Sequence, residues 1–205
     1  MTEAVIRNAR ETDDFYQIAA CLYLTDPFIY PAAFGDKPHE AAQAISALMG
    51  IPNGLFWYKK ILVAMCGKQV CGVLLYNKGG ARWEQAQCNC AVKEFVPDMA
   101  RFEYVAQAYF LEASGCPPKQ HTEVVACCVA PRFRRNGVAR ELLGHLICEH
   151  GGNDIALDVL ADNRAAVSLY SDFGFEIAET CKGFHVDPSN LPEVYRMIRK
   201  GIPAE

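Results

Sequence analysis

The chain has 205 residues, of which 51% are hydrophobic and 21% charged, and its formal net charge is -4. This composition is that of a globular domain and excludes a disordered, collagen-like or coiled-coil chain. The longest apolar runs are far shorter than the roughly 18 residues of a membrane helix, so we expect no membrane span. The negative charge argues against nucleic acid as a partner and favours a cationic one.

Neither the cysteine content nor the first residues of the chain predict secretion. The ten cysteines occur in a chain long enough to build its own core, and no two of them form a Cys-x-x-Cys pair. We therefore expect reduced thiols and no metal site. Residues 1–11 carry acidic side chains and no following apolar segment, which is not the pattern of a signal peptide. These features predict a cytoplasmic protein.

In the N-terminal half, apolar residues recur at the spacing of strands in some segments and at the spacing of helices in others. Its predicted elements are a strand over 4–7, a helix introduced by Asp13 and Asp14 and running to Leu22, a loop over 23–34, a helix over 39–49 and a hairpin over 61–66 and 69–76. The loop is predicted because Pro27 and Pro31 interrupt it. Its aromatic side chains either belong to the core or form the wall of a binding site: Tyr23, Phe28, Tyr30 and Phe34.

Residues 81–120 give the weakest pattern in the chain. Pro97 and Asp98 predict the start of one helix, whose apolar side chains share a face. The remainder shows no clear period, and we interpret 81–120 as a variable insertion that could wall an acceptor site.

The C-terminal half alternates strands and helices, which predicts an α/β architecture. Its predicted elements are a strand over 122–130, a helix over 137–150, a strand over 155–160, a helix over 163–173 and two strands over 175–180 and 193–199.

An arginine-rich turn joins the first strand of this half to its helix. The turn and the first helical turn hold four arginines in an otherwise acidic protein: Arg132, Arg134, Arg135 and Arg140. Gly137 and Ala139 are small enough for a ligand to approach the backbone closely. Free amides at a helix N-terminus, assisted by arginines, bind phosphate or pyrophosphate. The alternative interpretation of the same residues is a solvated basic turn.

The turn matches neither the Gly-x-Gly-x-x-Gly nor the Gly-x-x-x-x-Gly-Lys-Ser/Thr nucleotide motif. The sequence Arg134-x-x-Gly137-x-Ala139 instead resembles the phosphate-binding motif of the GNAT superfamily of N-acetyltransferases. Further similarity lies in Leu157-Asp158-Val159, in Asn163-x-x-Ala166-x-x-Leu169-Tyr170 and in Phe173-Gly174-Phe175. The resemblance implies one α/β (α+β) domain over 1–205, with a central mixed, mostly antiparallel β-sheet flanked by helices.

The resemblance also implies acetyl-CoA as cosubstrate, with its pyrophosphate on the turn and its pantetheine arm along the preceding strand. The expected contacts are the backbone of Cys128 and Val129, the side chain of Asn163, and the turn residues Arg134, Arg135, Asn136, Gly137, Val138, Ala139 and Arg140. No metal takes part in this scheme.

Acetyl transfer to an amine needs a base, because an alkyl amine of pKa about 10 is almost entirely protonated at neutral pH. By resemblance Glu123 is the candidate base, with His121 and water as alternatives, or else Glu123 is a solvent-facing carboxylate at a strand edge. By the same resemblance, Tyr170 is the acid for the departing thiolate, or else a buried packing residue. The backbone N–H of Val129 is the candidate donor to the oxyanion.

We therefore expect an acetyltransferase that moves the acetyl group directly to a primary amine of a small molecule or peptide. Two alternatives stay open, a non-catalytic module that binds acyl-CoA and a transferase of another acyl group. Nucleic acid and membranes are not expected as partners, and homodimers are common among proteins of this family.

Overall fold

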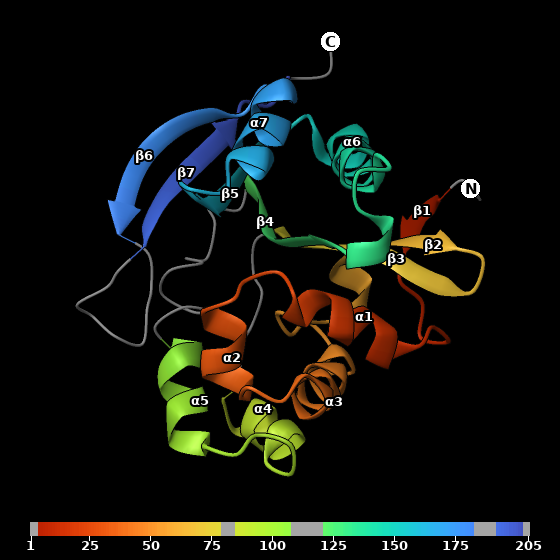
Figure 1. Ribbon diagram of the computed structural model, residues 1–205, viewed down its shortest axis with the longest axis vertical. Coiled ribbons are helices and arrows are strands. Elements are labelled where there is room, and N and C mark those ends of the chain that lie inside the picture. The colour runs from red at the N-terminus through yellow and green to blue at the C-terminus, as the bar shows by residue number, and fades with distance from the viewer. Residues whose placement is uncertain (1–3, 79–84, 108–120, 183–191, 203–205) are drawn as a thin grey trace.

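A seven-stranded sheet in the order β1-β2-β3-β4-β5-β7-β6 forms the centre of the protein (Figure 1). The computed structural model describes residues 4–78, 85–107, 121–182 and 192–202. Its strands are β1 Val5–Asn8, β2 Ile61–Cys66, β3 Gln69–Lys78, β4 His121–Val129, β5 Asp154–Leu160, β6 Glu176–Lys182 and β7 Glu193–Arg199. The pairing of β4 with β5 is parallel, and the other pairings are antiparallel. The predicted mixed, mostly antiparallel sheet is thus confirmed.

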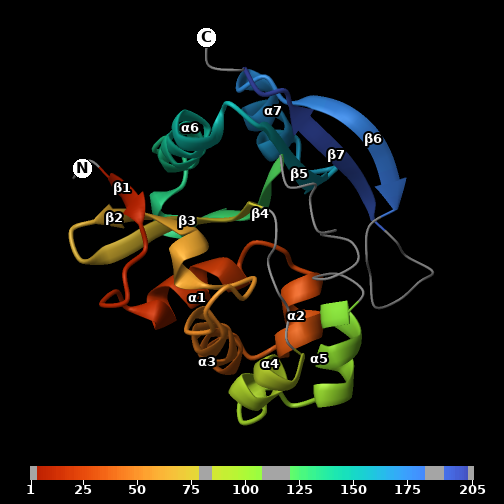
Figure 2. The same cartoon turned by 180° about the vertical axis from the view of Figure 1, so that it is seen from behind.

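Helices cover both faces of the sheet, and each face has its own apolar core (Figure 2). On one face lie α1 Phe15–Tyr23, α2 Ile29–Phe34, α3 Pro38–Met49, α4 Gln85–Val92 and α5 Met99–Val105; on the other lie α6 Val138–His150 and α7 Arg164–Asp172. Buried Phe34, Phe56 and Phe102 fill the first core, and Leu142, Leu146 and Phe175 belong to the second. Among the described residues, no helix is long and apolar enough to cross a membrane.

Two helices occur where the sequence predicted none. The helix α2 lies inside the predicted loop 23–34, because Pro31 falls in its first turn, where a missing N–H costs no hydrogen bond. Its Tyr30 and Phe34 are 2% and 0% exposed, and their rings contact Phe56. The core interpretation therefore holds for Phe34, whereas Tyr30 is buried but also lines a cavity described below, and Phe28 is 36% exposed. The sequence does not predict α4, because its apolar residues do not recur at helical spacing along one face.

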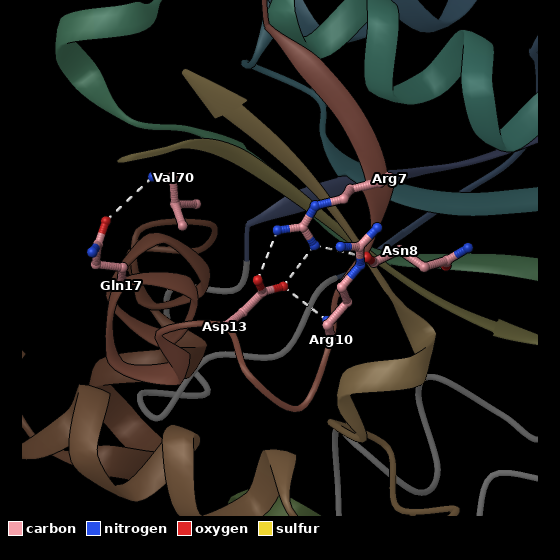
Figure 3. Close-up of polar contacts among 6 residues, drawn as sticks. All are labelled: Arg7, Asn8, Arg10, Asp13, Gln17 and Val70. Carbon is pink, nitrogen blue, oxygen red and sulfur yellow. Dashed lines mark hydrogen bonds and ion pairs between the residues drawn. The ribbon is translucent and has the colours of Figure 1, made fainter. Parts of the chain in front are cut away.

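Polar contacts fasten the first strand to the first helix (Figure 3). Both terminal nitrogens of Arg7 on β1 donate to the Asp13 carboxylate, each at 2.7 Å, and the Arg10 amide donates to the same group at 2.8 Å. The Arg7 hydrogen bond is the main reason why the pKa of Asp13 is lowered. On α1, the side-chain oxygen of Gln17 accepts from the Val70 amide at 3.3 Å. The Asp13 contacts thus join β1 to the segment that precedes α1, and the Gln17 contact joins α1 to the β2–β3 hairpin.

A single glycine lets α6 lie close to the sheet. A Cβ atom placed on Gly72 of β3 would lie 2.9 Å from Val138 Cγ1, 3.0 Å from the Cys128 carbonyl oxygen and 3.2 Å from Leu142 Cδ1. Such distances are shorter than normal van der Waals contacts, so only glycine fits here without movement of its neighbours. Gly72 thereby determines how deeply the N-terminal end of α6 sits.

The expectation of reduced thiols is wrong for one cysteine pair. Cys66 and Cys71 form a disulfide across the turn of the β2–β3 hairpin. Antiparallel pairing places their Cα atoms 6.1 Å apart, a separation that a disulfide spans without moving the backbone. The sequence could not show this pairing, because it depends on the register of the hairpin. Free thiols among the described residues include Cys21, Cys127 and Cys128.

Candidate functional site

The central strands β4 and β5 separate halfway along their length. Their paired residues run from His121 with Asp154 to Val124 with Leu157, and no pairing follows, although β4 continues to Val129. A register shift in the β3–β4 pairing, between Leu75 and Tyr76, lies beside the same point. The separation leaves one edge of residues 125–129 unpaired by β5 and opens space between the two strands.

The arginine-rich turn leads from the end of β4 into α6. Its backbone has two left-handed residues, Arg135 with φ 64° and Gly137 with φ 82°. Gly137 is the N-cap of α6 and has no side-chain group to satisfy the first amides of the helix. Those amides and the positive end of the helix dipole are therefore available to an anion. The requirement for glycine at 137 follows from its positive φ.

A cavity of about 420 Å³ lies between this turn and α7. Its lining includes Val129, Gly137, Arg134, Arg135, Arg140 and Tyr170. The structure thus brings most of the predicted cofactor residues to one cavity and makes it basic.

Two of these arginines also make contacts within the protein. The Arg134 Nε atom donates to the Val129 carbonyl oxygen at 3.1 Å, which folds its side chain back along β4. Arg140 pairs with Asp172 of α7, and its guanidinium lies 5.3 Å from the centre of the Phe173 ring. Arg140 therefore links α6 to α7 as well as facing the cavity.

The direction of the β4 backbone groups distinguishes the two residues expected to bind pantetheine. The Ala130 amide donates to Cys71 O of β3 at 2.9 Å. Backbone groups alternate in direction along an antiparallel strand, so those of Cys128 point toward β3 and those of Val129 and Cys127 toward the open edge. This geometry favours Val129 over Cys128 as a backbone partner for a ligand at that edge, and Cys127 as a second partner that the sequence did not suggest.

A second, smaller cavity of about 100 Å³ lies on the other side of Tyr170, between β4 and β5. Asp26 and Tyr30 line it from the N-terminal part of the chain, and Asp158 lines it from β5. The Asp26 carboxylate accepts from the Phe28 and Ile29 amides, which fixes its position at the start of α2. This cavity is acidic where the first is basic.

Three residues line both cavities: Cys127, Ala166 and Tyr170. Tyr170 is 8% exposed, and burial, followed by the effect of Cys127, raises its pKa. Burial also raises the pKa of the Cys127 thiol to about 12. At neutral pH both groups hold their protons, which suits Tyr170 as a proton donor and disfavours Cys127 as a nucleophile.

Asn163, expected to contact the cofactor, has a structural role in the fold. Its side-chain oxygen caps α7 by accepting from the Ala166 amide at 3.2 Å. The residue lines the smaller cavity. Its side-chain amide nitrogen stays a predicted ligand contact.

Glu123 is a buried carboxylate, not a solvent-facing one. It is 3% exposed, and its Oε1 atom accepts from Arg196 of β7 at 2.7 Å. The same Arg196 nitrogen donates to Asp158 at 3.0 Å. Burial raises the pKa of Glu123 to about 7, although Arg196 opposes that rise. A group with this pKa can gain and lose a proton near neutral pH.

The alternative base lies farther along the same strand, where β4 and β5 are still paired. His121 has its Nε2 atom 3.6 Å from the Asp154 carboxylate. Neither His121 nor Glu123 is among the residues that line the two cavities, but Arg196 joins Glu123 to Asp158, which does line the smaller one. This link favours Glu123 over His121.

The expected wall formed by 81–120 is only partly described. Residues 81–84 and 108–120 lie outside the described residues, as do most of the residues between β6 and β7. The described part, 85–107, contains α4 and α5, whose Phe102 and Val105 pack in the first core. Within the described ranges, no three His, Cys, Asp or Glu side chains are grouped as metal ligands.

Comparison with known proteins assigns the chain to a family. Residues 28–175 match the acetyltransferase (GNAT) family, and because this match spans most of the chain, the protein belongs to that family. N-alpha-acetyltransferase 50 of Danio rerio is 36% identical over 78 residues, which are 35% of this chain and 46% of that protein. The matched regions thus span about half, or less, of the curated relatives.

Solved structures show the same fold over nearly the whole chain. An N-acetyltransferase from Staphylococcus aureus Mu50 superposes with a TM-score of 0.66 at 18% identity, covering 95% of this chain and 100% of that one. The protein yncA from Salmonella typhimurium, solved with its cofactor acetyl-CoA, has a TM-score of 0.59 at 15% identity and covers 100% and 97% of the two chains.

Proposed function

We propose that this protein transfers the acetyl group of acetyl-CoA to a primary amine of a small molecule or peptide. The observation that carries the proposal is the meeting of a basic cavity and an acidic one at Tyr170. Phosphates bind arginines and a helix N-terminus, whereas an ammonium group binds carboxylates, so the two cavities suit the two substrates. Membership of the GNAT family supports the same assignment.

In this proposal the pyrophosphate of acetyl-CoA binds the amides of α6 and the arginines of the turn. The pantetheine arm runs along the open edge of β4, where Val129 and Cys127 present backbone groups. The thioester then lies where the two cavities meet, beside Tyr170. Arg135 adds its positive charge beside the pyrophosphate, whereas Asn136, Val138 and Ala139 shape this turn and expose its backbone.

The acceptor amine enters from the acidic cavity. Its ammonium group passes one proton to the carboxylate pair of Asp158 and Glu123, directly or through water, which frees the nitrogen lone pair. The nitrogen attacks the thioester carbon, and a bond forms while the carbonyl oxygen becomes an oxyanion that the Val129 N–H can stabilise. Collapse breaks the carbon–sulfur bond, and Tyr170 donates a proton to the departing thiolate. The nitrogen loses its second proton, which restores the Tyr170 hydroxyl, and the carboxylate pair releases the first proton to water. The products are the acetylated amine and CoA.

The test is to incubate purified protein with acetyl-CoA and a pooled panel of polyamines, amino acids, aryl-alkyl amines, aminoglycosides and short peptides. Mass spectrometry should detect a product heavier by one acetyl group. A thermal-shift series with acetyl-CoA and succinyl-CoA tests the acyl group at the same time. Stabilisation by acetyl-CoA with no acetylated product would favour a binding module, and stronger stabilisation by succinyl-CoA would overturn the acetyl assignment.

A further inference from the structure

Arg196 bridges the point at which the two central strands separate. It extends from β7, and one nitrogen donates both to Glu123 of β4, at 2.7 Å, and to Asp158 of β5, at 3.0 Å. The last β4–β5 pair, Val124 with Leu157, directly adjoins these two carboxylates in the sequence. One side chain on a third strand therefore joins Asp158, which lines the smaller cavity, to the buried carboxylate of Glu123.

The charges of this cluster do not balance within the described residues. Glu123 and Asp158 are two carboxylates that share one guanidinium. Glu179 lies opposite Arg196 in the register of β6 and β7 and adds a further negative charge near Asp158. A buried ion pair is costly to form unless its charges and hydrogen bonds are all satisfied. Here the excess charge is negative, and Asp158 presents it to the cavity.

One oxygen of the cluster also lacks a hydrogen bond. Within the described residues, the buried Oε2 atom of Glu123 has no partner. A carboxylate that served packing alone would be more stable with both oxygens bonded or replaced by an apolar group. The incomplete bonding and the excess charge both indicate a cationic group or proton as the missing component.

We propose that Arg196 is a positioning residue for acetyl transfer, which joins Glu123 and Asp158 into one carboxylate unit that holds and deprotonates the acceptor's ammonium group. This inference rests on the proposed function. Asp158 contacts the ammonium in the cavity, and one proton moves from nitrogen to a carboxylate oxygen of the unit. Arg196 stays protonated throughout. Its positive charge weakens the binding of the transferred proton to the two carboxylates.

The neighbouring titratable groups are few and can be named. Arg196 and Asp158 act on Glu123 from β7 and β5, and Glu179 acts on Asp158 from β6, where the Cys181 thiol also lies near Asp158 and Arg196. On the β3 side, Lys60 Nζ lies 3.5 Å from Asn77, the cross-strand partner of Glu123. On β4 itself, His121 precedes Glu123 by two residues and pairs with Asp154.

The direct test is the titration of Glu123 by carboxyl-carbon NMR, in protein with labelled glutamate, with the signal assigned by Glu123→Gln. Arg196→Met should move the titration to higher pH by about one unit or more, because a positive neighbour is lost. Arg196→Lys should restore it, since a single nitrogen makes both bonds and an ammonium group can replace it. Asp158→Asn should move it to lower pH, because a negative neighbour is lost. Arg199→Met, on the same strand, is the matched control and should leave it unchanged.

The functional readout is the pH profile of kcat/KM with acetyl-CoA and the amine that the panel identifies. The rising limb should move with the NMR titration in Arg196→Met and return in Arg196→Lys. If both variants lose activity equally with an unchanged pH profile, Arg196 is only structural and this inference is overturned. If Arg196→Met does not fold, Arg196→Lys and Asp158→Asn still test it by NMR and by kinetics.

These outcomes separate the inference from the proposed function. NMR titrations that move as expected, in a wild-type protein that acetylates no amine, overturn the function and leave the coupling of the carboxylates standing. Acetylation by the wild type, with a pH profile that Arg196→Met does not change, supports the function and overturns the role of Arg196.

Discussion

The two cavities that meet at Tyr170 differ in charge, in size and in the origin of their walls. The larger one, of about 420 Å³, is built from β4, the arginine-rich turn, α6 and α7, which follow one another closely in the sequence. The smaller one, of about 100 Å³, combines β4 and β5 with Asp26 and Tyr30 from the N-terminal part of the chain. A local motif can thus build a phosphate site, whereas an acceptor site needs elements from distant parts of the sequence.

The largest expected effect comes from a substitution that disrupts the basic cavity alone. Gly137→Glu places a bulky negative side chain at a left-handed position before α6, where we propose that the pyrophosphate binds. We expect the affinity for acetyl-CoA in calorimetry to fall at least about 1000-fold, roughly 4 kcal/mol. The control is Gly67→Glu in the β2–β3 hairpin, which has a similar φ of 64° and no atom near its Cβ position. Undiminished affinity in Gly137→Glu would refute the cofactor site.

The next effect concerns the chemistry at the junction of the cavities. Tyr170→Phe removes one oxygen and keeps the ring that packs 5.9 Å from Phe175. We expect kcat to fall about 100-fold with little change in affinity for acetyl-CoA, because a positioned acid contributes to rate and not to binding. Steady-state kinetics and calorimetry on the same preparation measure both quantities. Unchanged turnover would remove Tyr170 from the mechanism.

A smaller effect tests the support beneath the basic cavity. Gly72→Ala should lower the free energy of unfolding by about 2 kcal/mol, because its Cβ atom would overlap Val138 and the Cys128 carbonyl. Gly50→Ala is the control, since its Cβ atom would meet only Ala47 O at an ordinary 3.6 Å. Urea unfolding of both variants gives the comparison. Equal stability would show that α6 can move away from the sheet at no cost.

The smallest expected effect is a pH dependence of the free energy of unfolding, which arises from the acidic cluster beside the smaller cavity. Burial raises the pKa of Glu123 to about 7 from its ordinary value of 4.5. Between these values the folded protein holds a proton that the unfolded chain has lost, so stability falls as pH rises through this window. We expect Glu123 to contribute a decrease of about 1.4 kcal/mol for each pH unit within this window. Urea unfolding at several pH values should show the decrease in the wild type and a flatter profile in Glu123→Gln; identical slopes would contradict the assignment.

The basic cavity, where we propose that the cofactor binds, could be predicted from the sequence because its signals are local. A β-type run, small residues and clustered arginines occur within 122–140, and the structure places Arg134, Gly137 and Arg140 around one cavity. The starts of the helices capped by Asp14, Asp98 and Asn163 could also be predicted from the sequence, since a cap accepts from amides two or three residues away.

The acceptor side could not be predicted in the same way. Asp26 and Arg196 are separated by most of the chain, and no local pattern indicates that either approaches Asp158. The one signal that the sequence offers is a charged residue within a predicted strand, which interrupts an otherwise apolar or alternating run. That signal does not show which charged residues meet.

The sequence by itself therefore determined most of the elements, the fold class and the arginine-rich turn of this protein, because periodicity, capping and turn chemistry act over a few residues. The tertiary structure alone decided that Glu123 is buried on Arg196, that Cys66 pairs with Cys71, and that β4 and β5 separate beside Asp158. These features depend on strand order and register, which bring together residues that are far apart in the chain.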